Sequence, residues 1–148
     1  MALNIVPIFV GAPRIGFALL SASSATAIKN RDGSGILGTD VVAVFSASAS
    51  GSRVDSITIV PQGTNVQSVI TFFVNNGQFN ESASNNAAFY DVTMPATTTS
   101  TNNAQGQTAI NFPNGLNLSG SNRIMAATGT TVASGYYIVA YGGDYITI

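Results

Sequence analysis

The stretch "SRVDSITIVPQGTNVQSVITFFVNNG", residues 52–77, contains two short apolar runs that turn-forming residues separate. The first run alternates, which places Asp55, Ile57 and Ile59 on one face of a predicted strand. The second run, "VITFFV", is almost continuously apolar, as expected of a central strand covered on both faces. The "NNG" that follows predicts a hairpin turn, since Asn and Gly tolerate positive φ. Both runs indicate β-structure.

Short apolar runs bounded by turn residues recur along the rest of the chain and predict further strands at residues 39–45, 87–94, 107–112, 122–128 and 135–143. Asn114-Gly115 is expected to be another turn, and the polar stretch 95–107 a long exposed loop. No stretch has the period of an amphipathic helix. We expect an all-β fold: a single jelly-roll-like β-sandwich with long polar loops, with a smaller barrel as the alternative.

Charged residues make up only 7% of the 148 residues, against about 25% in ordinary soluble domains. The apolar fraction is 45%, so the chain can bury a core. A β-rich surface with so little charge favours permanent association with other proteins. The five basic residues are scattered and the net charge is −1, which argues against nucleic acid as a partner. The absence of Cys excludes disulfides and thiol chemistry.

The spacing G-x-G-x-x-G occurs at Gly33, Gly35 and Gly38, as in dinucleotide-binding loops. That function requires a helix directly after the glycines, but "TDVVAVF" is β-branched and aromatic and predicts a strand. We therefore expect a loop between strands and no nucleotide. The related segment "NRDGSG" also lacks the terminal Glu of a calcium loop, because the twelfth position is Val41.

Catalytic chemistry has few candidates in this chain. His is absent, which removes the commonest general base and metal ligand. The six carboxylates are scattered and form no specific pair. We expect no enzymatic activity, no cofactor and no metal site.

The N-terminal stretch "MALNIVPIFVGAPR", residues 1–14, is interpreted either as an extended arm or as the first strand, before a single sandwich domain at 15–148. It lacks a basic start and two prolines interrupt it, so it suits neither a signal peptide nor a membrane span. As an arm, it would contact a partner through apolar burial or strand addition. The candidate contact residues are Ile5, Val6, Ile8, Phe9, Val10 and Arg14.

Tyrosines gather near the C-terminus, at Tyr136, Tyr137, Tyr141 and Tyr145. Tyr136 and Tyr137 must point to opposite faces of one strand, so only part of the group shares a surface. Tyr is favoured at protein interfaces, and we expect Tyr137, Tyr141 and Tyr145 to contact another subunit. A sugar-binding face is the alternative.

Two stretches resemble a group of small tailed-phage virion proteins. The first, residues 21–77, has a strand that ends in the "NRDGSG" turn and a "GSR" that leads into an alternating strand. The second, residues 115–145, ends in "GGDY". Together they cover a little over half of the chain. The chain departs from the group's pattern in three places: the longer link at 35–50, the polar stretch 95–107 and the residues after "GGDY".

This resemblance implies a head decoration, or cement, protein with a β-sandwich fold. It would be made in the host cytoplasm and would bind the major capsid protein on the outer surface of the capsid. There it would stabilise the shell by bridging capsomers, as a homo-oligomer and specifically a trimer. Two alternatives remain open: a tail or baseplate component of the same virion, and a carbohydrate-binding β-sandwich module.

Overall fold

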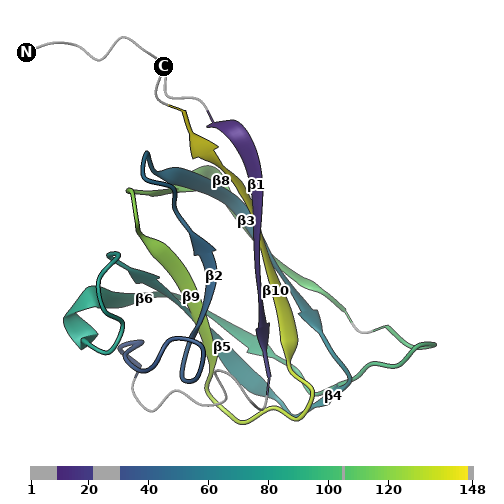
Figure 1. Ribbon diagram of the computed structural model, residues 1–148. Coiled ribbons are helices and arrows are strands. Elements are labelled where there is room, and N and C mark those ends of the chain that lie inside the picture. The colour runs from purple at the N-terminus through teal and green to yellow at the C-terminus, as the bar shows by residue number, and fades with distance from the viewer. Residues whose placement is uncertain (1–9, 22–30, 105, 147–148) are drawn as a thin grey trace, which may run out of the picture.

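The computed structural model describes residues 10–21, 31–104 and 106–146, which form two four-stranded antiparallel sheets (Figure 1). One sheet has the order β1-β10-β3-β8 and the other β2-β9-β5-β6. Their bounds are β1 Val10–Leu20, β2 Val42–Ser46, β3 Ser52–Pro61, β5 Ser68–Asn75, β6 Asn86–Met94, β8 Thr108–Leu118, β9 Arg123–Thr128 and β10 Tyr136–Tyr145. Two short strands, β4 (Thr64–Asn65) and β7 (Thr97–Thr98), pair with each other, and η1 (Ala83–Asn85) is a single 3₁₀ turn.

The strand pairs are nested. β1 pairs with β10, β2 with β9, β3 with β8 and β5 with β6, all antiparallel. A long hairpin whose two arms are paired in this way and then rolled up gives a jelly-roll-like sandwich. The all-β sandwich predicted from the sequence is therefore confirmed.

The core lies between the inner faces of the two sheets and includes Ile57, Ile59, Ile70, Phe72 and Ile138, none of which is exposed. A row of three rings packs against it near the edge strands β6 and β8. Phe72 lies 6.4 Å from Phe89, and Phe89 lies 6.4 Å from Phe112 of the opposite sheet, measured between ring centroids. Such tilted aromatic pairs add to the burial of their area.

The predicted face of Asp55 is wrong, because β3 contains a bulge. Val54 pairs with Gly142 and Ser56 with Tyr141, so Asp55 is an extra residue opposite β10. Val54 and Ile57 are consequently both buried, although two residues separate them. Asp55 is part-exposed and accepts a hydrogen bond from Arg53 Nε at 2.7 Å. A bulge shifts the alternation by one residue, which a strict two-residue period cannot anticipate.

Strand β5 is central and covered on both faces, as predicted. Ile70 and Phe72 face the core, while the Phe73 ring on the outer face is completely buried. The cover comes from the segment before β2, whose Gly33 lies directly against the Phe73 ring. In the same segment Arg31 forms an ion pair with Asp91 of β6. A hydrogen bond from Thr71 and this arginine lower the pKa of Asp91.

The glycine spacing is therefore structural. Gly33, Gly35 and Gly38 all have positive φ, and strand β2 follows them, as expected for a loop. Within the described ranges the only helical element is η1, and no helix is long and apolar enough to cross a membrane.

Two predicted turns differ in detail. Asn75–Gly77 does turn the chain, with Gly77 at φ 91° and its N–H bonded to Asn75 Oδ1, but it opens a longer connection that reaches β6 only at Asn86. Asn114-Gly115 does not join two strands. It lies in a bulge of β8, since Asn111 pairs with Ser56 and Leu116 with Val54. The polar stretch 95–107 is mostly exposed loop, although it contributes β7.

We predict that Gly33→Ala lowers the free energy of unfolding by about 1–3 kcal/mol. The backbone there has φ 74°, and an added Cβ would lie 2.6 Å from Phe73 Cδ1. Gly38→Ala is the matched control, because φ is 89° but nothing lies within 4 Å of the added Cβ. Urea unfolding of both variants separates backbone strain from the clash. Equal losses of unfolding free energy in the two variants would show that Gly33 does not pack tightly against the Phe73 ring.

Candidate interaction surface

Strand β1 carries an apolar row on its solvent side. Its side chains alternate, so that Ala18 and Leu20 pack on the core while Ile15, Phe17 and Leu19 point outward. Ile15 is 59% exposed and Phe17 is 74% exposed. Large apolar side chains are usually buried, so an exposed row of them on one strand is an informative feature.

Strand β10 continues this surface, because its register places outward residues directly beside those of β1. Ile15 pairs with Tyr141, Phe17 with Val139 and Leu19 with Tyr137. Tyr137 and Tyr141 are each 42% exposed, whereas Tyr136 is fully buried. Direct partners in an antiparallel pair lie on the same face of the sheet. We call these six residues, Ile15, Phe17, Leu19, Tyr137, Val139 and Tyr141, the β1–β10 outer face.

The β1–β10 outer face is uncharged, and so are the residues of β3 and β8 that continue its rows. Tyr141, Val139 and Tyr137 pair on their other side with Ser56, Thr58 and Val60 of β3, respectively. Beyond them, Ser56 and Thr58 pair with Asn111 and Ala109 of β8. None of these residues is Asp, Glu, Lys or Arg. Removing such a surface from water therefore involves no desolvation of a charge.

The two sheets differ in how their outer faces are treated. The segment 31–41 covers the outer face of β5, where Phe73 is buried. On the other sheet, Phe17 and its neighbours on the β1–β10 outer face remain exposed in the described part of the chain. Within the described residues, the chain thus covers the outer face of one sheet and leaves the β1–β10 outer face uncovered.

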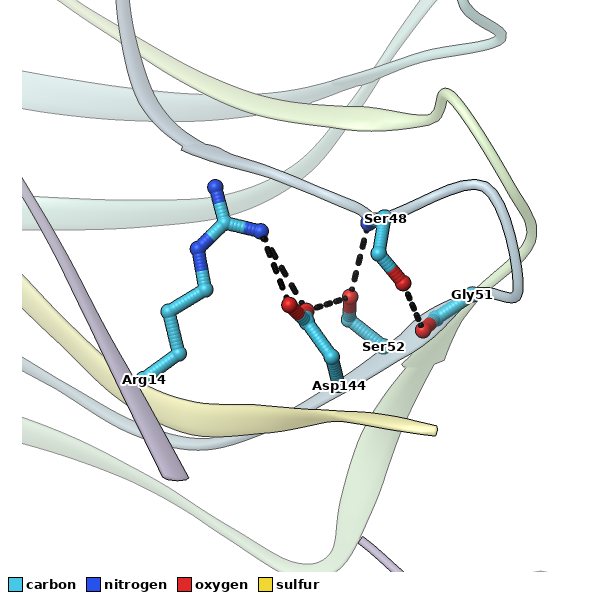
Figure 2. A network of polar contacts seen from close by, with 5 residues as sticks. All are labelled: Arg14, Ser48, Gly51, Ser52 and Asp144. Carbon is cyan, nitrogen blue, oxygen red and sulfur yellow. Dashed lines mark hydrogen bonds and ion pairs between the residues drawn. The ribbon is translucent and has the colours of Figure 1, made fainter. Parts of the chain in front are cut away.

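A polar network around Arg14 connects β1 to neighbouring segments of the chain (Figure 2). Arg14 Nη1 donates to Asp144 Oδ1 at 3.2 Å and to Oδ2 at 3.3 Å. Asp144 Oδ1 also accepts a 2.5 Å hydrogen bond from Ser52 Oγ, which in turn accepts one from the Ser48 N–H at 3.0 Å. The network therefore joins β1, β10, the start of β3 and the β2–β3 connection.

Arg14 also reaches the opposite sheet. Its guanidinium carbon lies 5.1 Å from the centre of the Phe45 ring on β2, within the range of a cation–π contact. Arg14 shares the inward side of β1 with Ala18 and Leu20, so its contacts hold the neighbouring Ile15 on the outward side. A one-residue slip of β1 would turn the apolar row inward and break the ion pair.

The structure places the predicted contact residues in three groups. Tyr137 and Tyr141 lie together on the β1–β10 outer face. Tyr145 is half-buried, and its hydroxyl donates to Asn117 Oδ1 at 2.5 Å. Val10 and Arg14 belong to β1. The other candidates lie outside the described residues: Ile5, Val6, Ile8 and Phe9.

Sequence reasoning missed Ile15, Phe17 and Leu19. Their signal was present as the alternation in "RIGFALL", residues 14–20, but it became meaningful only with the knowledge that β1 pairs with β10. The i, i+4 spacing of Tyr137 and Tyr141 was the matching signal on the partner strand.

Among the described residues, no group of three or more His, Cys, Asp or Glu side chains is placed to hold a metal ion. No protein-family model, curated protein or solved structure matches the chain.

We predict that Asp144→Ala lowers the free energy of unfolding by about 1–2 kcal/mol, since it removes the acceptor of Arg14 and of the buried Ser52 hydroxyl. Asp55→Ala is the control. Its ion pair with Arg53 lies within one strand and is about half exposed, so we expect a loss of at most about 1 kcal/mol. Chemical denaturation measures both. A smaller loss for Asp144→Ala than for Asp55→Ala would contradict the anchoring role.

Proposed function

We propose that this protein is a structural component of a bacteriophage virion, specifically a decoration protein that binds the outer capsid surface and stabilises the shell. The β1–β10 outer face is the observation that carries the proposal. Its six residues are aliphatic or aromatic, none is charged, and two paired strands hold them side by side, a composition typical of the core of a protein interface. The resemblance to small tailed-phage virion proteins supplies the kind of particle.

Burial of this face is the driving force of the proposed association. Apolar area contributes about 25 cal/mol per Å² removed from water, and a standard interface covers about 800 Å² on each partner. Phe17, Tyr137 and Tyr141 are aromatic, the residue class enriched in interface cores. Tyr hydroxyls can still form hydrogen bonds when the rings are buried.

Stabilisation of the shell follows from mass action. A protein that binds assembled capsomers, but not free subunits, shifts the equilibrium toward the assembled shell. As a trimer it would engage several capsid subunits at once, so that weak contacts add as avidity. The N-terminal segment with Ile5, Val6, Ile8 and Phe9 is a second candidate contact with the major capsid protein.

Two other functions fit parts of the same description. A tail or baseplate component would use the β1–β10 outer face in the same way. A carbohydrate-binding module is favoured by one specific observation, the exposure of both Tyr137 and Tyr141 on one face. In that case Tyr141→Ala would abolish sugar binding.

Location on the particle tests the proposal directly. Electron microscopy of purified phage with gold-labelled antibody to this protein should show label distributed over the head. Label confined to the tail would replace the decoration role by a tail or baseplate role. The absence of label from all particles would overturn the virion assignment.

We predict that Phe17→Ala reduces incorporation into particles at least about tenfold, because a central aromatic side chain of an interface contributes about 2 kcal/mol or more. Phe79→Ala is the matched control. Phe79 is 82% exposed, like Phe17 a surface ring, but it lies on the β5–β6 connection of the other sheet. Quantitative mass spectrometry of purified particles measures both, after circular dichroism has verified folding. Equal incorporation of the two variants would contradict the proposed interface.

A further inference from the structure

A cavity of about 320 Å³ opens to solvent far from the β1–β10 outer face, beside the sheet that contains β5 and β9. It lies between the segment before β2 and the connection from β5 to β6. Its lining consists of Leu37, Gly77, Gln78, Phe79, Asn80, Glu81 and Arg123. This volume is at the lower end of the range for small-molecule sites.

Side-chain hydrogen bonds hold the walls of this cavity. Asn80 is buried, and its Nδ2 donates to the carbonyls of Gly33 and Gly35 at 3.1 and 2.9 Å. Asn85 Nδ2 donates to the Phe79 carbonyl at 2.9 Å. The connection is therefore fixed in place although it is long, which reduces the entropy that a ligand would have to overcome.

Within this fixed connection the largest apolar side chain points to solvent. Phe79 is 82% exposed, more than any other large apolar side chain of the described residues. A rigid backbone that presents an uncovered ring is suited to stacking against a ligand. Leu37, also exposed, adds a second apolar wall.

Polar groups complete the cavity. Arg123 is oriented by Asn75 Oδ1, which accepts from its Nη2 at 2.8 Å, and by the Gln78 carbonyl, which accepts from the same nitrogen. Glu81 supplies an acceptor, and the Gln78 side chain supplies both a donor and an acceptor. Asn80 Oδ1, in the cavity wall, has no hydrogen-bond partner among the described residues. The charges of Glu81 and Arg123 cancel, which favours a neutral ligand.

We propose that this cavity is a saccharide-binding site. A pyranose ring has an apolar C–H face, which would stack on Phe79, and a rim of hydroxyls that both donate and accept hydrogen bonds. Arg123 would donate to these hydroxyls, Glu81 would accept from them, and Gln78 would do either. The proposal is independent of the decoration role, because the site and the β1–β10 outer face are on different sheets.

The test is saturation-transfer-difference NMR of the full chain with the methyl glycosides of glucose, galactose, mannose, rhamnose and N-acetylglucosamine, each at millimolar concentration. We expect saturation of the ring protons of at least one glycoside. Phe79→Ala should weaken that binding at least about tenfold, and Glu81→Gln should weaken it less because an acceptor remains. Phe79 is so exposed that its truncation should leave the fold intact.

Phe17→Ala and Tyr141→Ala are the matched controls, and both should bind the same glycoside as tightly as the unmodified chain. Binding that depends on Tyr141 but not on Phe79 would overturn the proposed site and place the saccharide on the β1–β10 outer face. No saturation transfer from any of the five glycosides would overturn the proposal as well. Neither result depends on whether the protein decorates a capsid.

Discussion

The two-residue period of β1 and β10 constrains the rest of the molecule. Each strand has one face in the core, where Leu20 and Ile138 are completely buried, so the residues between must face outward. Because the two strands pair in register over almost their whole length, their outward side chains form one continuous surface. These outward residues lie outside the core, so packing of the core does not explain why they are apolar.

The outer faces of the two sheets differ in whether the described chain covers their apolar residues. On one sheet, the glycine-rich segment 31–41 covers Phe73, and the positive φ of Gly33 lets the backbone lie directly on the ring. On this sheet, a segment of the chain itself therefore buries the aromatic residue on the outer face. The β1–β10 outer face has no such cover in the described residues, and its lack of charge suits it to association with a second protein.

Much of the fold could be predicted from the sequence. Runs such as "VITFFV" and "NRIMAAT" have the β-branched and apolar content of buried strands, and the glycine spacing followed by "TDVVAVF" correctly indicated a loop. The bulge at Asp55 could not be predicted, because it depends on how β3 pairs with β8 and β10 at once. The prediction of a turn at Asn114-Gly115 was wrong for the same reason, because the bulge there depends on how β8 pairs with β3.

The candidate surface was only half predictable. Tyr137 and Tyr141 could be recognised in the sequence because they are aromatic and an even number of residues apart on one strand. Their neighbours Ile15, Phe17 and Leu19 come from the opposite end of the chain. Only the closure of the sandwich by β1 and β10 brings the two sets together. The same holds for the cavity at Phe79, which needs the hydrogen bonds between Asn80 and the segment at Gly33 and Gly35.

We propose that another protein covers the β1–β10 outer face in the assembled particle. Covalent tyrosine labelling of intact particles, compared with the free protein, tests it most directly. We expect Tyr137 and Tyr141 to lose most of their reactivity in the particle. Tyr90 of β6, which is 45% exposed on the other sheet, should stay reactive. If Tyr137 and Tyr141 react equally in the particle and in the free protein, no other protein covers this face.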